Sequence, residues 1–117
     1  MPGKIRDSVL FHGSLSSTGE TQVFECRNAF DSTLLWVKIC VSPESMIAFG
    51  LYLKPYNSAE NWFPSQANAV FWDQSVQGPG TFDKKVWIPL HDGDKIYMVA
   101  THPGVTAFLS GYQRTTT

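Results

Sequence analysis

The 117-residue sequence has little charge, two cysteines and no long apolar run. Charged residues make up 16% of the chain, against about 25% in an average soluble protein. The net charge is −1, and the nine Lys and Arg residues are scattered along the chain. Binding to nucleic-acid phosphates needs clustered cations, so we expect no nucleic-acid partner. A surface with so few charges favours contact with other proteins.

The sequence also shows no segment typical of a membrane span or of a secretory signal. The unbroken apolar runs are short, such as Leu34 to Val37, whereas crossing a bilayer takes about 20 apolar residues. The segment from Met1 to Arg6 lacks the apolar stretch of a secretory signal. We therefore expect a soluble chain made in the cytoplasm, with no membrane partner.

The two cysteines, Cys26 and Cys40, show neither CxxC spacing nor a companion histidine pattern. A structural zinc site uses about four ligands, usually in close pairs, so the sequence predicts no metal and no cofactor. Two reduced, buried thiols are the expectation for a cytosolic product. A single disulfide between Cys26 and Cys40 remains the alternative, provided that the strands that carry them pair with each other.

Strand patterns separated by turn residues recur along the chain. In the clearest, Thr33 to Val41, the residues from Leu35 at every second position form one apolar face that we expect to point to the core. The segment 47–53 repeats the alternation, and we predict a hairpin between these two strands. The eight expected strands span residues 8–15, 21–26, 33–41, 47–53, 69–72, 86–90, 95–100 and 105–111.

This spacing, without any sustained helical period, predicts an all-β fold: a single small antiparallel β-sandwich of about eight strands, with jelly-roll connections as one arrangement. The length suits one globular domain with one core. We expect an extended N-terminal arm over residues 1–7, the sandwich domain over 8–112 and a C-terminal tail over 113–117.

Candidate chemistry is confined to a polar turn near the C-terminal strands. His91, Asp92, Asp94 and His102 are residue types that a cupin-like metal site would use. Asp92 and Gly93 are also the pair that a tight turn requires, and we favour this structural role. The sequence has no GxSxG elbow, and no histidine lies in a catalytic signature. We predict no catalytic residue, no metal ligand and no enzyme.

The long segment 54–68 carries three aromatic residues, Tyr56, Trp62 and Phe63. Loops of this length are often functional. Trp36 and Trp87 lie within strands and are predicted to be packed, so the loop aromatics are the better candidates for a partner contact. Aromatic residues beside amide and acidic neighbours also suit a sugar-binding platform, which stays open as an alternative.

Several segments together resemble small β-sandwich virion proteins of tailed bacteriophages. They are Val37 to Cys40, Leu51 to Pro55, Ile88 to Tyr97 and Val105 to Tyr112. The resemblance spans nearly the whole chain and implies a non-enzymatic capsid decoration protein or minor tail component, located in the virion. Its partners would be the major capsid protein or tail subunits, together with further copies of itself. The aromatic loop around Trp62 departs from the family pattern.

Attachment to an assembled particle would use the arm and the loop. An extended arm can add a strand to a neighbour's sheet edge, and many symmetric copies multiply a weak contact. We expect Ile5 and Arg6 of the arm, with Tyr56, Trp62 and Phe63 of the loop, to make these contacts. The alternative is a tail-associated or receptor- and carbohydrate-binding module, in which Tyr56 and Trp62 would face a sugar.

Overall fold

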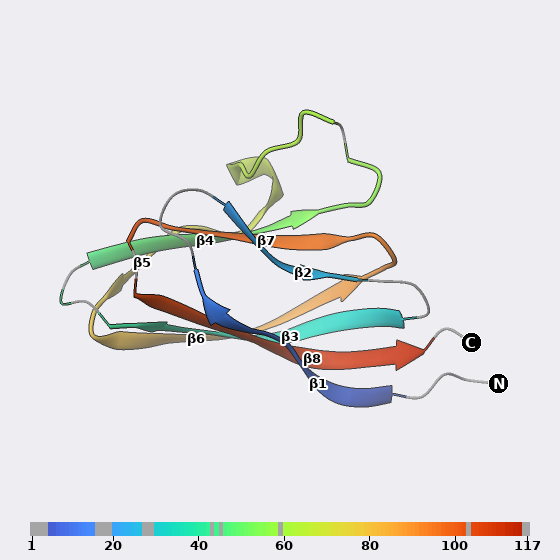
Figure 1. Cartoon of the computed structure of the whole chain (residues 1–117), viewed down its shortest axis with the longest axis horizontal. Helices are drawn as coiled ribbons and strands as arrows, with labels where there is room; N and C mark the ends of the chain where they lie inside the picture. The colour runs from blue at the N-terminus through green and yellow to red at the C-terminus, as the bar shows by residue number, and fades with distance from the viewer. Residues whose placement is uncertain are drawn as a thin grey trace.

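The computed structural model is a two-layered β-sandwich (Figure 1). It describes residues 5–15, 20–26, 30–42, 44, 46–58, 60–102 and 104–115. The elements are β1 (Ile5–Ser14), β2 (Glu20–Glu25), β3 (Phe30–Val41), β4 (Met46–Lys54), the short 3₁₀ helix η1 (Gln66–Asn68), β5 (Ala69–Gln77), β6 (Gly80–Leu90), β7 (Lys95–Ala100) and β8 (Val105–Thr115). The predicted all-β sandwich of about eight strands is confirmed. No helix in the described part of the chain is long and apolar enough to span a membrane.

The strands form two four-stranded sheets, in the orders β1-β8-β3-β6 and β2-β7-β4-β5, with every pair antiparallel. Consecutive strands alternate between the sheets, except that β4 pairs with β5. This nested order, in which the first strand pairs with the last, is that of a jelly roll. The expected jelly-roll connectivity is therefore present.

The predicted hairpin between the strands now called β3 and β4 is wrong. β3 pairs with β6 and β8, whereas β4 belongs to the opposite sheet. The segment between β3 and β4 crosses from one sheet to the other. β3 pairs with strands that are distant in sequence and not with β4. β2 and β3 also lie in different sheets, so Cys26 and Cys40 are not brought together by strand pairing, and both are free thiols.

The core lies between the two sheets and consists of alternating residues from facing strands. In β3, however, Leu34 is fully buried and Leu35 is only half-buried, because the register shifts between Leu34 and Trp36 against both neighbouring strands. Such a bulge adds one residue and changes which side chains face inward. The inward face predicted from Leu35 onward is therefore correct from Val37 and wrong at Leu35.

The two ends of the described chain lie side by side. β1 begins at Ile5, which pairs with Arg114 near the end of β8. The described part of the expected arm, Ile5 to Asp7, thus belongs to the sheet, while residues 1–4 lie outside the described residues. In Figure 1 this end of the sandwich also carries the β6–β7 turn and the β4–β5 loop, which stands above the β2-β7-β4-β5 sheet.

Candidate functional site

The polar turn between β6 and β7 is organised by the buried carboxylate of Asp94. Its Oδ2 accepts a hydrogen bond from the backbone N–H of His91 at 3.0 Å, and its Oδ1 accepts one from the backbone N–H of Tyr56 at 3.1 Å. Gly93 has a φ of 91°, a conformation that favours glycine. Asp94 thus closes its own turn and ties the start of the β4–β5 loop to it. Gly93 has the turn role that the sequence favoured, but the carboxylate that bonds the backbone N–H groups is that of Asp94 and not that of Asp92.

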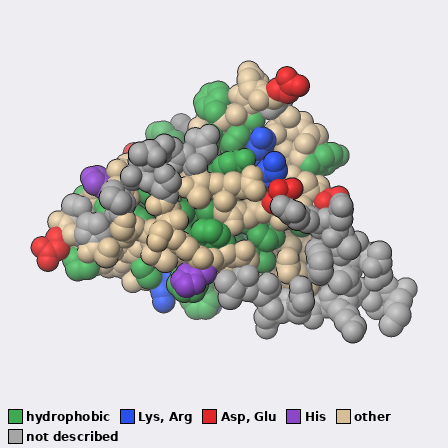
Figure 2. Space-filling view, in the orientation of Figure 1, with side chains coloured by type: hydrophobic (Ala, Val, Ile, Leu, Met, Phe, Trp, Pro, Cys, Tyr) green, Lys and Arg blue, Asp and Glu red, His purple; other side chains and the backbone are tan. Residues whose placement is uncertain are grey.

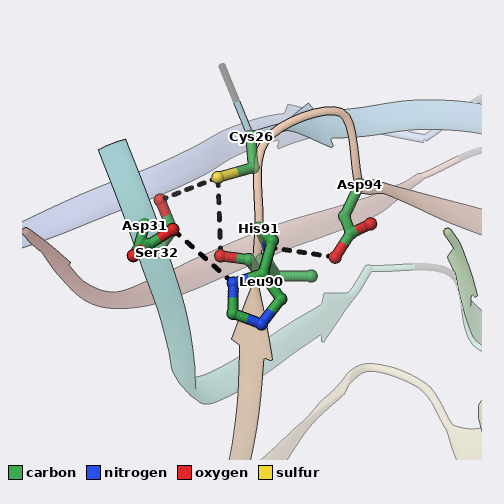
Figure 3. Close-up of polar contacts among 6 residues, drawn as sticks. All are labelled: Cys26, Asp31, Ser32, Leu90, His91 and Asp94. Carbon is green, nitrogen blue, oxygen red and sulfur yellow. Dashed lines mark hydrogen bonds and ion pairs between the residues drawn. The ribbon is translucent and has the colours of Figure 1, made fainter. Parts of the chain in front are cut away.

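The thiol of Cys26 lies behind this turn, as Figure 3 shows. Its Sγ lies 3.7 Å from Ser32 Oγ and 3.6 Å from the carbonyl oxygen of Leu90, so its single hydrogen has two acceptors within reach. Burial raises the pKa of Cys26 above its usual value, because the charged thiolate would lose hydration. A protonated thiol is a poor nucleophile. The environment therefore fits a structural cysteine.

The histidines of the candidate metal set are separated by the length of a strand. His91 Nδ1 lies 3.5 Å from Asp31 Oδ1 in a surface pair. His102 follows the other end of β7, where its Nδ1 is 3.0 Å from Thr101 Oγ1. A six-residue strand is roughly 20 Å long, so these side chains do not converge. Within the described ranges, no group of three or more His, Cys, Asp or Glu is placed to hold a metal ion.

The β4–β5 loop is fastened to the outer side of its own sheet through Trp62. The Trp62 ring lies 5.3 Å from the ring of Tyr97 on β7, measured between centroids. The ammonium of Lys54 lies 5.4 Å from the Trp62 ring centroid and 6.0 Å from that of Tyr97. Tyr97 in turn donates its hydroxyl hydrogen to Gln22 Oε1. Trp62 is therefore a partly buried anchor of the loop.

The far part of the loop is braced by Asn68. Its side-chain oxygen accepts from the backbone N–H of Ser65, and its side-chain N–H₂ donates to the carbonyl of Phe63. With the loop held at both places, Tyr56 and Phe63 are 71% and 67% exposed. Two of the three loop aromatics proposed as contacts are thus presented to solvent. Ile5 and Arg6 are the first two residues of β1. The structure describes their backbone and not their side chains.

A second exposed aromatic surface was missed from the sequence. Trp36 and Trp87, predicted to be packed, are 47% and 68% exposed on the β1-β8-β3-β6 sheet, and the exposed Phe108 lines a hollow together with Trp36. Their strand neighbours Val37 and Leu109 are fully buried, so alternation alone places Trp36 and Phe108 outward once the inward face is known. Lys38 could have indicated this from the sequence. It shares a face of β3 with Trp36, and a lysine is rarely buried, so that face is expected to point to solvent.

The face of the molecule shown in Figure 2 carries few charged side chains. Hydrophobic side chains lie at the surface of this face among uncharged polar ones (Figure 2). Exposed apolar residues are common singly, but gathered ones mark interaction sites. The low charge content of the sequence is thus matched on this face, and the exposed large hydrophobic residues of the described chain are mostly aromatic.

No protein-family model and no curated protein matches the chain. Among solved structures, it is similar to a chain in the structure of infectious bursal disease virus Gx strain, with a TM-score of 0.54 and 12% identity, over 97% of this chain and 32% of that one. The structure of the Gt strain of that virus gives a TM-score of 0.46 and 10% identity, over 96% and 31%. A pentameric capsid protein from metagenomic phage sequences gives a TM-score of 0.26 and 13% identity, over 97% and 68%. The Gx likeness shows a shared fold, and this chain spans about a third of that viral chain.

The arrangement favours binding over chemistry. The most buried polar groups at the turn, Asp94 and Ser32, are occupied by hydrogen bonds that hold loops together. The exposed aromatic side chains include two on a braced loop and three on the outer face of the β1-β8-β3-β6 sheet, while Trp72 is exposed on the other sheet. Such side chains provide large contact areas at low entropic cost. The candidate functional surfaces are therefore the β4–β5 loop and the outer face of the β1-β8-β3-β6 sheet.

Proposed function

We propose that this chain is a non-enzymatic virion structural protein, which decorates and stabilises an assembled capsid shell. The observation that carries the proposal is the jelly-roll order of all eight strands, aligned over 97% of the chain with part of a virus structure. The eight-stranded jelly roll is a recurrent architecture of viral capsid domains. Fold does not fix function by itself, so the surfaces must supply the attachment.

The β4–β5 loop is the first proposed attachment surface. Tyr56 and Phe63 are highly exposed on a loop that is held by Trp62 and Asn68. A loop fixed before binding loses little conformational freedom on contact, so more of the interaction energy is available for affinity. In this proposal Tyr56 and Phe63 contact the shell, and Trp62 positions them.

The N-terminal strand is the second proposed attachment surface. β1 is an edge strand, paired only with β8 among the described strands. An edge presents unpaired backbone groups that can accept a neighbour's strand. Ile5 and Arg6, which are part of the expected arm, are the first residues of this strand. The partner would be the major capsid protein, and symmetric repetition over many copies would multiply a weak contact.

Co-sedimentation with shells tests the proposal. Shells of the encoding virus that lack this chain would be mixed with purified chain and pelleted. The wild-type chain should pellet with the shells, and the Tyr56→Ala/Phe63→Ala variant should stay in the supernatant, with roughly a tenfold or greater loss of affinity. Trp87→Ala is the matched control, because it removes an equally exposed aromatic from the opposite sheet and should pellet normally.

Two results would contradict parts of this proposal. A chain that never pellets with shells would exclude decoration, and normal pelleting of the double variant would exclude the loop. The number of copies per mature particle, from stained gels, separates decoration from a tail position. Hundreds of copies are expected for a decorated shell, whereas a tail component would be present in few.

A further inference from the structure

A hollow of about 270 Å³ lies on the outer face of the β1-β8-β3-β6 sheet, lined by Trp36, Lys38, Phe108 and Ser110. The register places Trp36 opposite Ser110 and Lys38 opposite Phe108 on β3 and β8. The four side chains thus form a square, with the two aromatic residues at opposite corners and the two polar residues at the others. Diagonal neighbours in a sheet are roughly 7–8 Å apart, which leaves room for one ring-sized ligand between the aromatics.

Both aromatic side chains are held in place from behind. The indole N–H of Trp36 donates to Asp83 Oδ1 on β6 at 3.2 Å. The ring of Phe108 stacks on the imidazole of His12 on β1, with centroids 3.9 Å apart and planes 15° apart. The walls of the hollow are therefore oriented before any ligand arrives, and little side-chain entropy is lost on binding.

The lining of the hollow carries a local positive charge, although the net charge of the whole protein is −1. Lys38 is the charged residue among those lining the hollow. The β3–β6 register places Asp83 opposite Lys38 and Lys85 opposite Trp36 on the neighbouring strand, and of these charged residues only Lys38 lines the hollow. An anionic group on the ligand complements this local positive charge.

We propose that this hollow binds an acidic pyranose, a six-membered sugar ring that bears a carboxylate. The C–H groups of the ring would lie against the electron-rich face of Trp36, with Phe108 on the other side. The Lys38 ammonium would pair with the carboxylate, and the Ser110 hydroxyl would bond a ring hydroxyl. The hollow is smaller than pockets for drug-sized ligands, which are roughly 300–1,000 Å³, and so suits a single sugar unit.

This site faces away from the first proposed attachment surface, the β4–β5 loop, although it lies on the sheet that also contains β1, the second. The β4–β5 loop stands on the outer side of the β2-β7-β4-β5 sheet (Figure 1), whereas the residues that line the hollow belong to β3 and β8 of the other sheet. A chain attached through its loop would leave the hollow open to solvent. The inference does not depend on the proposed attachment, because sugar binding is measured on the isolated chain.

Titration of the full, ¹⁵N-labelled chain tests the inference. The probes are methyl glucuronide, its neutral counterpart methyl glucoside, and acetate as a carboxylate without a ring. The indole N–H signal of Trp36, identified by its loss in Trp36→Ala, should shift with a dissociation constant on the order of 1 mM for the glucuronide. The glucoside should bind roughly tenfold more weakly, and acetate should cause no shift.

Variants assign the interactions. Lys38→Gln should reduce glucuronide affinity to that of the glucoside, and Phe108→Ala should weaken both sugars, while Trp72→Ala, an exposed aromatic on the other sheet, should change neither. Absence of a saturable shift at tenfold the expected dissociation constant would overturn the proposal. Equal binding of the two sugars would exclude the acidic class, and a shift with acetate alone would show an anion site without sugar recognition.

Discussion

At the scale of single residues, Gly111 shows how close β8 lies to β3. A Cβ added at this position would collide with the backbone carbonyl of Thr33, which a side-chain rotation cannot relieve. We predict that Gly111→Ala lowers the free energy of unfolding by about 2 kcal/mol or more, because the two central strands must separate. Urea unfolding followed by circular dichroism measures the loss.

Gly13→Ala is the matched control on the same sheet. There the added Cβ would meet the far end of the Phe11 ring at 3.1 Å, and a ring can move. The expected loss is below about 1 kcal/mol, near the small effect of surface substitutions. Equal losses for the two variants would show that the Gly111 contact does not limit the approach of the strands.

The tryptophans show which part of a site the sequence could predict. Trp62 was expected to contact a partner because it lies in a loop, but its ring lies against Tyr97 and Lys54 of the sheet. Trp36 was expected to be packed because it lies in a strand, but its side chain is on the outer face. Position in a strand or loop does not determine exposure, since an outward strand residue of a two-layered sandwich has no layer above it.

At the scale of elements, the β4–β5 loop depends on one aromatic anchor. We predict that Trp62→Ala frees the loop while leaving the sandwich folded, because the lost contacts are with Tyr97 and Lys54 on the outer side of the sheet. Aromatic and cation–π contacts of this kind each contribute roughly 0.5–1.5 kcal/mol. Cleavage after the exposed Glu60 by a glutamate-specific protease should therefore accelerate roughly tenfold.

Phe63→Ala is the neighbouring control, since the Phe63 side chain is exposed and its backbone carbonyl, which accepts from Asn68, is retained. Its cleavage rate should match that of the wild-type chain. An unchanged rate for Trp62→Ala would mean that the backbone bonds around Asn68 and Tyr56 hold the loop without the tryptophan.

Strand positions were predictable, whereas strand partners were not. The segments 95–100 and 105–111 were placed correctly within β7 and β8, because alternation and turn residues are local signals. The pairing of β1 with β8 and of β3 with β6 and β8 depends on contacts between distant parts of the chain. The bulge after Leu34 is likewise invisible to a strict period of two, because it arises from register against both neighbours.

At the scale of the whole molecule, the two ends of the chain have unequal roles in the same sheet. β1 is an edge strand with one partner, whereas β8 lies between β1 and β3. Among the strands that the structure describes, residues Ile5 to Asp7 pair only with Arg114 to Tyr112. The same stretch of β8 also pairs with Asp31 to Thr33 of β3. Losing the end of β8 therefore removes all the pairs that losing the start of β1 removes, and further ones as well.

We predict that a chain lacking residues 1–7 remains folded with moderately lower stability, whereas a chain lacking residues 112–117 loses much more. The second deletion also uncovers the edge of β3 at Ser32 and Thr33, which are buried, and leaves polar backbone groups without partners. Urea unfolding of both chains gives the comparison, and equal losses would contradict the register. Because the chain lacking residues 1–7 stays folded, its failure to pellet with shells would identify the arm and the first residues of β1 as a contact and not merely as support for the fold.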